Sequence, residues 1–333
     1  MVLQPNKTLV ACLGEALIDM FNLKKGQPLI NATRFKAVPG GAPANVAIGL
    51  AKLGIKCAFI GRLGKDDFGF KLERVLSENG VDTTHILFDE NTRTGLAFVS
   101  MIDENTQDFL FYRNPSADMM LSISDLDKAF LSRVSILHFG SLSLGAQRSR
   151  EATYAAVAQV KKSGGMISFD VNYRRFLWPD KEKAIELFCE AIRMSDIVKV
   201  NEIEVRLISG EEDVQMGARE LARRFDAQFF LTLGPEGSWF VSKRGFVHMP
   251  AFRVKTLDST GCGDGFMAGL IASIVREGIN FRSINLEKIK GALRFANAVG
   301  ALVSTKLGVI PAMPTYARVA RFLKNADNIE ARS

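Results

Sequence analysis

The segment DSTGCGDGFMAG, residues 258–269, surrounds one carboxylate with glycines. Gly261, Cys262 and Gly263 precede Asp264, and an apolar run typical of a buried helix follows. Amide N–H groups in the first turn of a helix bind anions, and glycine lets an anion come close to the backbone. A carboxylate beside such a site could take the proton of a hydroxyl that attacks the anion. The structural alternative is a tight turn in which Asp264 caps the helix.

A second pair of glycines stands near the start of the chain, in the segment PGGAPANVAIGLAKLG. Gly40 and Gly41 come directly before a stretch of helical spacing, and Asn45 falls in its first turn. The asparagine amide offers both donors and an acceptor, which suits a polyol. The segment indicates a sugar site, with a plain junction between loop and helix as the alternative.

The segment VNEIEV places Asn201 and Glu204 three residues apart, on one face of a helix. Both side chains carry oxygen atoms of the kind that Mg²⁺ or its bound waters prefer. A solvated helix start is the structural alternative. The sequence contains neither GxxxxGK followed by Ser or Thr, nor GxGxxG after the first apolar run. A P-loop enzyme and a dinucleotide-dependent oxidoreductase are therefore disfavoured.

The composition fits a globular protein with a substantial core. Of the 333 residues, 47% are hydrophobic and 24% charged. The formal charge is +7 and the pI about 9.2, but the basic residues are dispersed, in doublets such as Lys24-Lys25 and Arg223-Arg224. Without a basic tail or an aromatic-basic block, we do not expect nucleic acid as a partner. A mild positive field suits an anionic small molecule equally well.

The cysteines Cys12, Cys57, Cys189 and Cys262 form no CxxC pair, and three of them lie in apolar runs, as expected of buried, reduced thiols. The histidines are too far apart in sequence to indicate a metal cluster. The N-terminus lacks the features of a signal peptide, and the uncharged stretch 134–147 is too short to span a bilayer. We therefore expect a cytoplasmic protein without a membrane partner.

Short apolar runs alternate with longer segments of helical spacing. Strands are predicted at 8–14, 57–61, 135–140, 166–172, 196–201 and 229–234, and helices at 44–54, 66–80, 150–162, 181–194 and 215–225. This alternation predicts an α/β fold with a parallel sheet and right-handed crossovers. Ligands of such sheets bind outside the carboxyl ends of the strands. Polar residues that follow the predicted strands include Gly14, Glu15, Asp19, Asp170, Asn172, Arg174, Asn201, Glu204, Thr232 and Gly234.

Two segments break the alternation. Residues 17–38 contain short β-like pieces around a turn, and 94–113 read as a hairpin. They predict a small β lid on the main sheet. Because no repeat, low-complexity stretch or clear linker is present, we expect one domain over 1–333, with the lid formed by about 17–38 and 94–113.

Taken together, these segments resemble the ribokinase-like PfkB carbohydrate kinases. Both signature regions are present, PGGAPANVAIGLAKLG and DSTGCGDGFMAG, and between them GRLGKDDFG, DVNYR, NEIE and TLGPEGS match in order. Within the family, the stretches GEALIDMF, FYRNPSAD and DVNYRRFLWP are most similar to those of fructokinases. The commoner loop has alanine where this chain has Cys262.

The resemblance implies a three-layer α/β/α fold with a central, mainly parallel sheet and a small β lid. It also implies transfer of the ATP γ-phosphoryl group to O6 of D-fructose, with Mg²⁺ and K⁺ as candidate cofactors. Asp264 would be the base, and the backbone of Gly261, Cys262 and Gly263 would hold the phosphoryl group. The implied sugar-binding residues are Asp19, Gly41, Asn45, Arg113, Asn172 and Arg174. Lys199, Thr232, Gly234, Gly237 and Asn297 would contact ATP, Asn201 and Glu204 would organise Mg²⁺ through water, and Asp258 and Thr260 would belong to a potassium site.

Two alternative functions stay open. A kinase for the sugar acid 2-keto-3-deoxygluconate could clamp the substrate carboxylate between Arg113 and Arg174. Phe98 and Phe111 argue against it, because that branch tends to have tyrosines in the lid strands. A catalytically silent, fructokinase-like binding protein is the other alternative, which the presence of Asp264 disfavours. The resemblance further implies a homodimer formed through the lid sheets, where exposed strand edges seek a partner.

Overall fold

The computed structural model describes residues 8–103 and 106–330 and arranges their strands in two sheets. The larger sheet has the order β13-β12-β11-β10-β9-β8-β1-β4-β5. Neighbouring strands are parallel from β11 to β5, and the pairs at the other edge, β11-β12 and β12-β13, are antiparallel. In chain order the strands are β1 (Val10–Leu13), β4 (Cys57–Gly64), β5 (Asp82–Asp89), β8 (Ile136–Gly140), β9 (Met166–Asp170), β10 (Ile197–Asn201), β11 (Gln228–Thr232), β12 (Ser238–Ser242) and β13 (Gly245–Met249).

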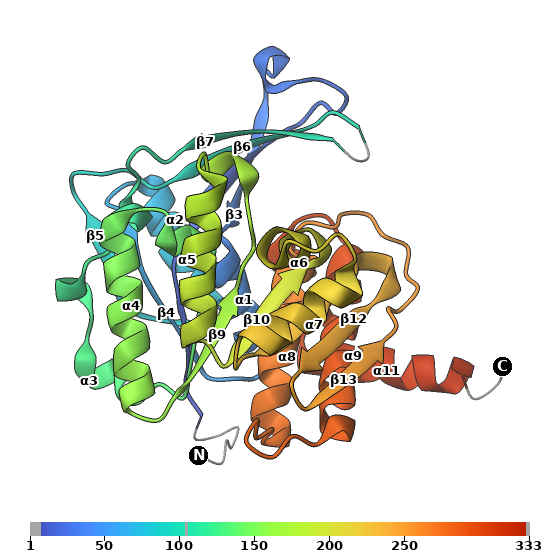
Figure 1. The fold of residues 1–333 in the computed structure, drawn as a ribbon. Helices are drawn as coiled ribbons and strands as arrows, with labels where there is room; N and C mark the ends of the chain where they lie inside the picture. The colour runs from blue at the N-terminus through green and yellow to red at the C-terminus, as the bar shows by residue number, and fades with distance from the viewer. Residues whose placement is uncertain (1–7, 104–105, 331–333) are drawn as a thin grey trace.

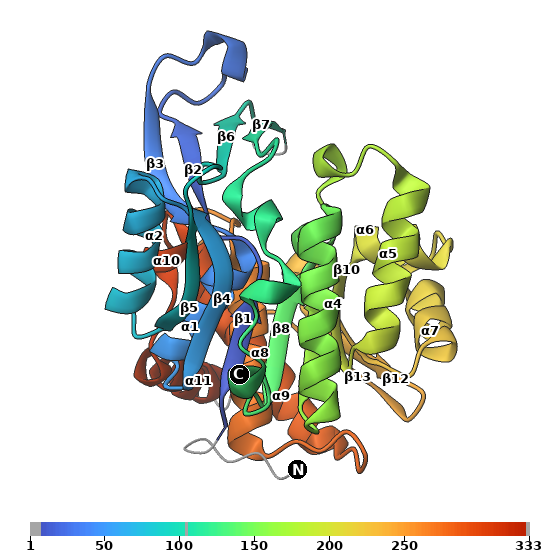
Figure 2. The same cartoon turned by 90° about the vertical axis from the view of Figure 1, so that its left-hand side faces the viewer.

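Helices cover both faces of this sheet, which confirms the expected three layers (Figures 1 and 2). The α-helices are α1 (Ala42–Lys52), α2 (Asp67–Glu78), α3 (Lys128–Leu131), α4 (Gln147–Lys162), α5 (Lys181–Met194), α6 (Glu202–Ser209), α7 (Val214–Arg224), α8 (Cys262–Glu277), α9 (Leu286–Ser304), α10 (Val309–Ala312) and α11 (Tyr316–Glu330). One core holds buried residues of α4, α5 and α7, and the other holds those of α1, α8 and α9.

Strand β1 illustrates how the sequence builds both cores at once. Successive side chains of a strand point to opposite faces of the sheet. Val10 and Cys12 belong to the core on the α1 side, whereas Ala11 and Leu13 belong to the core on the α4 side. Because both faces are covered by helices, the strand reads as a continuous apolar run rather than as an alternating one.

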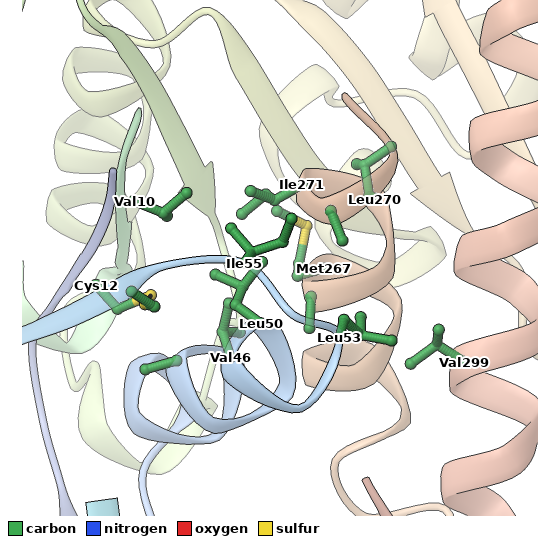
Figure 3. Close-up of a cluster of buried hydrophobic side chains, with 14 of the residues drawn as sticks. Val10, Cys12, Val46, Leu50, Leu53, Ile55, Met267, Leu270, Ile271 and Val299 are labelled. Carbon is green, nitrogen blue, oxygen red and sulfur yellow. Dashed lines mark hydrogen bonds between the residues drawn. The ribbon is translucent and has the colours of Figure 1, made fainter. Parts of the chain in front are cut away.

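The packing of α1 on α8 fixes the positions of the two glycine-rich helix starts (Figure 3). Leu50 and Leu53 of α1 and Met267 and Ile271 of α8 lie in this core with their side chains fully buried. A Cβ atom at Gly49 would come within 2.6 Å of the Cβ of Ala268, so glycine allows the two helices to approach closely. The amino ends of both helices consequently lie at one cavity, described below.

The smaller sheet consists of β2 (Leu17–Asn22), β3 (Phe35–Gly40), β6 (Leu96–Met101) and β7 (Gln107–Tyr112), in the order β3-β2-β6-β7. Two antiparallel hairpins meet where β2 runs parallel to β6. In Figure 1 this sheet rises above the main body of the protein. The segments predicted to form the lid therefore do form a separate small sheet.

Most of the predicted elements are confirmed, with ends that shift by a few residues. The prediction for 181–194 matches α5, and that for 44–54 corresponds to α1 at Ala42–Lys52. The sequence analysis assigned no element to β5, β12 and β13, or to α9 and α11. Among the residues described, no helix combines the length and apolar character needed to cross a bilayer.

Candidate active site

A cavity of about 520 Å³ opens at the carboxyl ends of the central strands, between the large and the small sheet. It collects residues from distant parts of the chain: the ends of β10 and β11, the first turns of α1 and α8, and one face of the small sheet. The lining includes the following predicted site residues: Asp19, Gly41, Asn45, Asn172, Arg174, Lys199, Asn201, Thr232, Thr260, Gly261, Gly263 and Asp264. The other predicted residues, Arg113, Glu204, Gly234, Gly237, Asp258, Cys262 and Asn297, do not line it.

Gly261 ends the loop that leads into α8. It is the N-cap residue of this helix, with φ 76°, a left-handed conformation that glycine adopts without strain. A Cβ atom at this position would lie within 2.4 Å of the Val309 side chain, so the site excludes other residues. Asp264 is therefore not the cap, and it lies in the first helical turn. The first-turn N–H groups have no partner within the helix, which suits an anion in the cavity.

Asp264 is buried, with 8% of its surface exposed, at the wall of the cavity. Its Oδ2 accepts a hydrogen bond from Nδ2 of Asn45 at 2.8 Å, across the contact between the two helices. Burial raises the pKa of Asp264 to about 6, against the lowering effect of the Asn45 bond. The group is consequently a carboxylate at neutral pH, but a much better proton acceptor than an exposed aspartate.

Lys199 of β10 holds a positive charge at the bottom of the same cavity. Its Nζ lies 3.0 Å from Oδ1 of Asp170, and both side chains are almost fully buried. Burial lowers the pKa of Lys199, but the charges of Asp170 and Glu204 outweigh it, so that the pKa is raised. A Cβ atom at Gly263 would lie 3.1 Å from Nζ, which places the ammonium group against the start of α8. A permanent cation therefore stands next to the predicted phosphoryl site.

The predicted sugar-binding residues come together, with one exception. Asp19, Asn45 and Asn172 all line the cavity. Asn172 follows β9 with φ 38°, a conformation that asparagine tolerates better than most residues. The exception is Arg113, which pairs with Asp118 and does not line the cavity. The predicted guanidinium fork over the sugar is therefore not found in this structure, because a neighbouring acid on the same loop holds the side chain.

The two faces of the small sheet have different surroundings, and only one of them lines the cavity. Phe111 of β7 lines the cavity, together with Phe109. Phe98 of β6 instead packs against Phe35 and Tyr112, whose ring centroids lie 5.1 and 5.4 Å away. Both residues lie in strands of the small sheet, as predicted, but only Phe111 lies on the face that lines the cavity.

Two of the predicted nucleotide-binding residues, Lys199 and Thr232, line the cavity, and three do not. Asn297 donates from Nδ2 to the carbonyl groups of Met249 and Pro250, at 3.0 and 3.1 Å. Gly237 packs against the same segment, where a Cβ atom would lie 2.1 Å from the Met249 oxygen. Gly234 also lies outside the cavity lining. Asn297 and Gly237 thus have local structural partners, and nucleotide contacts at all three positions stay a prediction.

The predicted Mg²⁺ residues form a capping box at the start of α6. Oδ1 of Asn201 accepts from the Glu204 N–H at 2.9 Å, and Oε2 of Glu204 accepts from the Asn201 N–H at 2.8 Å. Oε1 of Glu204 accepts from Tyr173, and the residue is only 1% exposed. Because both carboxyl oxygens of Glu204 accept these bonds, the residue does not fit as a direct ligand of Mg²⁺. Contact with Mg²⁺ through water stays a prediction.

The predicted potassium residues and Cys262 surround the loop before α8. Oδ1 of Asp258 accepts from the Thr260 N–H at 2.9 Å, and only Thr260 lines the cavity.

Burial raises the pKa of the Cys262 thiol to about 12, reinforced by Asp258 and Asp264. The thiol is therefore protonated, which does not favour redox sensitivity. No group of three or more His, Cys, Asp or Glu residues that could hold a metal ion occurs in 8–103 and 106–330.

Glu15 is a buried acid of the cavity to which the sequence assigned no role. Glu15 follows β1 in the stretch GEALIDMF, is 3% exposed and lines the cavity. Its Oε1 accepts from the Ala42 N–H at the start of α1, at 3.1 Å, whereas Oε2 is buried without a partner. The only signal in the sequence was the position of Glu15 after the first strand, and several other polar residues have a similar position after a strand.

A buried carboxylate, the first turn of a helix and a buried cation thus line one cavity, a combination that suits phosphoryl transfer. Residues 7–316 match the pfkB family carbohydrate kinase profile, and the chain belongs to this family.

Similar proteins include several with fructokinase names. Fructokinase-1 of Oryza sativa subsp. japonica is 39% identical over 322 residues, covering 96% of this chain and 98% of the relative. The crystal structure of fructokinase with bound ATP from Xylella fastidiosa has a TM-score of 0.85 at 30% identity, covering 96% of this chain and 99% of that one. A double mutant of fructokinase from Vibrio cholerae O395, with fructose, ADP and potassium ion bound, has a TM-score of 0.84 at 31% identity, covering 97% and 99%.

Proposed function

We propose that this protein is an ATP-dependent fructokinase that transfers the γ-phosphoryl group to O6 of D-fructose. The observation that carries the proposal is the buried carboxyl group of Asp264, held by Asn45 at the cavity wall in the first turn of α8. The fructokinase relatives, together with neighbouring structures that contain ATP or fructose, support the choice of reaction and sugar.

The unpartnered polar atoms of the cavity favour a polyhydroxylated substrate. Oε2 of Glu15 and Oδ1 of Asn45 are buried without a hydrogen-bond partner. A buried acceptor left unpaired costs roughly 1–3 kcal/mol, which a bound donor would recover. Sugar hydroxyl groups are such donors, and the apolar side chains of Phe109 and Phe111 can cover the carbon face of the ring.

The proposed reaction needs little covalent help from the protein. Asp264 accepts the proton of the attacking hydroxyl, while Asn45 holds the carboxylate in place. The amide groups at Gly261–Gly263 and the ammonium group of Lys199 stabilise the charge on the transferred phosphoryl group. Mg²⁺ bound with the nucleotide would add charge neutralisation, and Asn201 could hold it through water. The small sheet would exclude water from the cavity.

The two alternatives receive less support. A 2-keto-3-deoxygluconate kinase would need the clamp of Arg113 and Arg174, but Arg113 pairs with Asp118 outside the cavity lining. A silent binding protein would not need a base at the phosphoryl site, whereas Asp264 and its helix start are intact. A homodimer through the edge strands β3 and β7, a cytoplasmic location, one domain over the chain and activation by K⁺ stay predictions.

The test is release of ADP, measured by a coupled assay over a panel of fructose, 2-keto-3-deoxygluconate, ribose and glucose, with and without K⁺. We expect fructose to give the highest kcat/KM, and NMR of the product to show phosphate on O6. A clear preference for the sugar acid, or no turnover of any sugar together with normal ATP binding, would overturn the proposal.

A further inference from the structure

Glu15 places a second carboxyl group in the cavity, apart from the one assigned to proton transfer. The residue is 3% exposed, and both it and the first turn of α1 belong to the cavity lining. Oε1 has a structural task, because it accepts the Ala42 N–H where no side chain of the N-cap residue does so. Oε2 has no partner in the protein. Capping the helix therefore explains one oxygen of this side chain and leaves the other unexplained.

Both carboxyl groups are bonded to the first turn of α1. Ala42 bonds to Glu15, and Asn45 bonds to Asp264. Residues three apart lie on the same face of a helix, about 4.5 Å apart along its axis. That length corresponds to a few carbon atoms of a sugar. A hexose with one hydroxyl group at Asp264 can therefore present a different hydroxyl group to Glu15.

The charges around Glu15 leave an excess of negative charge. The positive charge of Arg113 acts on Glu15, but Arg113 also pairs with Asp118. One guanidinium group therefore has to neutralise two acids. Burial raises the pKa of Glu15 to about 7, and Arg113 only partly opposes this effect. Asp19 adds a further buried acid to the cavity lining, and burial together with the charge of Asp264 raises its pKa to about 7. The exposed Arg174 and Arg175 of the lining are screened by water and salt, unlike these buried groups.

We propose that Glu15 binds the sugar directly: its free Oε2 accepts a hydrogen bond from a hydroxyl group that does not react, and its charge makes the cavity favour a neutral sugar over a sugar acid. The inference rests on the proposed function and names the residue that sets substrate class. Like charges in a desolvated site repel each other strongly, so one buried carboxylate can reject another.

The test compares three variants with the wild type at pH 8, where the carboxylate form of Glu15 predominates. Glu15→Gln keeps an oxygen for the Ala42 N–H but removes the charge, and Glu15→Asp keeps the charge but shortens the side chain. Asp196→Asn is the matched control, because it removes a carboxylate whose pKa burial also raises and that also accepts a backbone N–H, but that lies outside this cavity lining. KM and kcat are measured for fructose and for 2-keto-3-deoxygluconate, and thermal unfolding checks that each variant is folded.

For Glu15→Gln we expect KM for fructose to rise about tenfold with kcat within about twofold, since a charge-assisted hydrogen bond is roughly twice as strong as a neutral one. The preference for fructose over the acid should fall by about tenfold. Glu15→Asp should raise KM for fructose while the preference stays, and Asp196→Asn should change neither by more than about twofold.

The outcomes separate this inference from the proposed function. If the wild type prefers fructose but Glu15→Gln behaves like Asp196→Asn, the role of Glu15 is wrong and the fructokinase proposal stands. If the wild type prefers the sugar acid, both are wrong. If Glu15→Gln does not fold, Glu15→Asp decides: an unchanged KM for fructose would contradict direct binding.

Discussion

The two ends of the central sheet carry cavities of similar size and very different chemistry. The cavity at the carboxyl ends measures about 520 Å³, and one at the amino ends of β9, β10 and β11 measures about 570 Å³. Lys161, Lys243, Arg244 and Arg282 line the amino-end cavity, so it looks at least as suited to an anion. Size and charge alone would not tell the two apart.

The difference lies in how the charged groups are satisfied. At the amino ends, Nη1 of Arg244 donates to two backbone carbonyl groups at 2.7 and 3.1 Å, and Lys243 lies 3.6 Å from Asp226. The buried oxygen without a partner there, Oε1 of Gln228, belongs to a neutral amide. At the carboxyl ends, burial raises the pKa of three acids, Glu15, Asp19 and Asp264. The amino-end cavity has one such acid, Asp196, whose carboxylate accepts the Ile167 N–H. A cluster of desolvated acids marks the functional end, because a fold has no reason of its own to gather them.

The largest effect that this comparison predicts is that of the substitution Asp264→Asn. The variant keeps an oxygen for the bond from Asn45 but cannot accept the proton of the sugar hydroxyl. We expect kcat to fall by about 10²–10⁴, the usual contribution of a positioned base, while ATP binding measured by calorimetry is unchanged. Asn201→Ala, which leaves the base in place, serves as the comparison variant. Turnover of Asp264→Asn within tenfold of the wild type would remove the base from the mechanism.

The same substitution should stabilise the protein, in a manner that depends on pH. A carboxyl group whose folded pKa is raised from 3.8 to about 6 binds its proton more tightly in the folded state. Its stabilising contribution is therefore present below pH 3.8 and is lost as pH rises to 6. Asp264→Asn avoids this loss, so we expect a gain on the order of 3 kcal/mol above pH 6, at 1.36 kcal/mol for each pKa unit.

Chemical denaturation at pH 4, 5, 6 and 8 measures this gain. The difference between the variant and the wild type should grow between pH 4 and 6 and then stay constant. A difference that is independent of pH would mean that the carboxyl group is not desolvated in the folded protein.

The pH dependence of catalysis gives a third comparison. Because the base must be ionised, log kcat/KM for fructose should fall by about one for each pH unit below a pKa near 6. Burial sets this pKa and Asp170 raises it further, while the hydrogen bond from Asn45 and the charges of Lys199 and Arg174 lower it. Rates from pH 5 to 8.5, at saturating ATP, measure the profile. A midpoint near 4, the value of an exposed aspartate, would show that the carboxyl group of Asp264 is solvated rather than buried.

The sequence was sufficient for six strands of the large sheet, for the layers and for the small sheet. Helix α8 and its glycine loop are local features, so the position of Asp264 in the first turn follows from residues next to it in the chain. The sequence could not show where a distant or competing partner holds a side chain. Arg113 follows strand β7, but Asp118 on the next turn captures its side chain. Asn297 bonds to carbonyl groups 47 and 48 residues away, which a motif cannot reveal.

The smallest expected effect belongs to the amino-end cavity and completes the comparison. Replacing Lys243 and Arg244 together by glutamine removes two positive charges from its lining, yet kcat, KM for fructose and KM for ATP should all stay within about twofold. The reason is that these exposed side chains act on Asp226 and on backbone carbonyl groups rather than on buried unpaired groups. The free energy of unfolding should change by less than about 1 kcal/mol, as for other exposed ion pairs. The double variant Lys36→Gln with Lys71→Gln loses the same charge elsewhere and controls for net charge. If only the amino-end variant alters the kinetics, a cluster of buried acids would no longer suffice to tell a functional end of the sheet from a structural one.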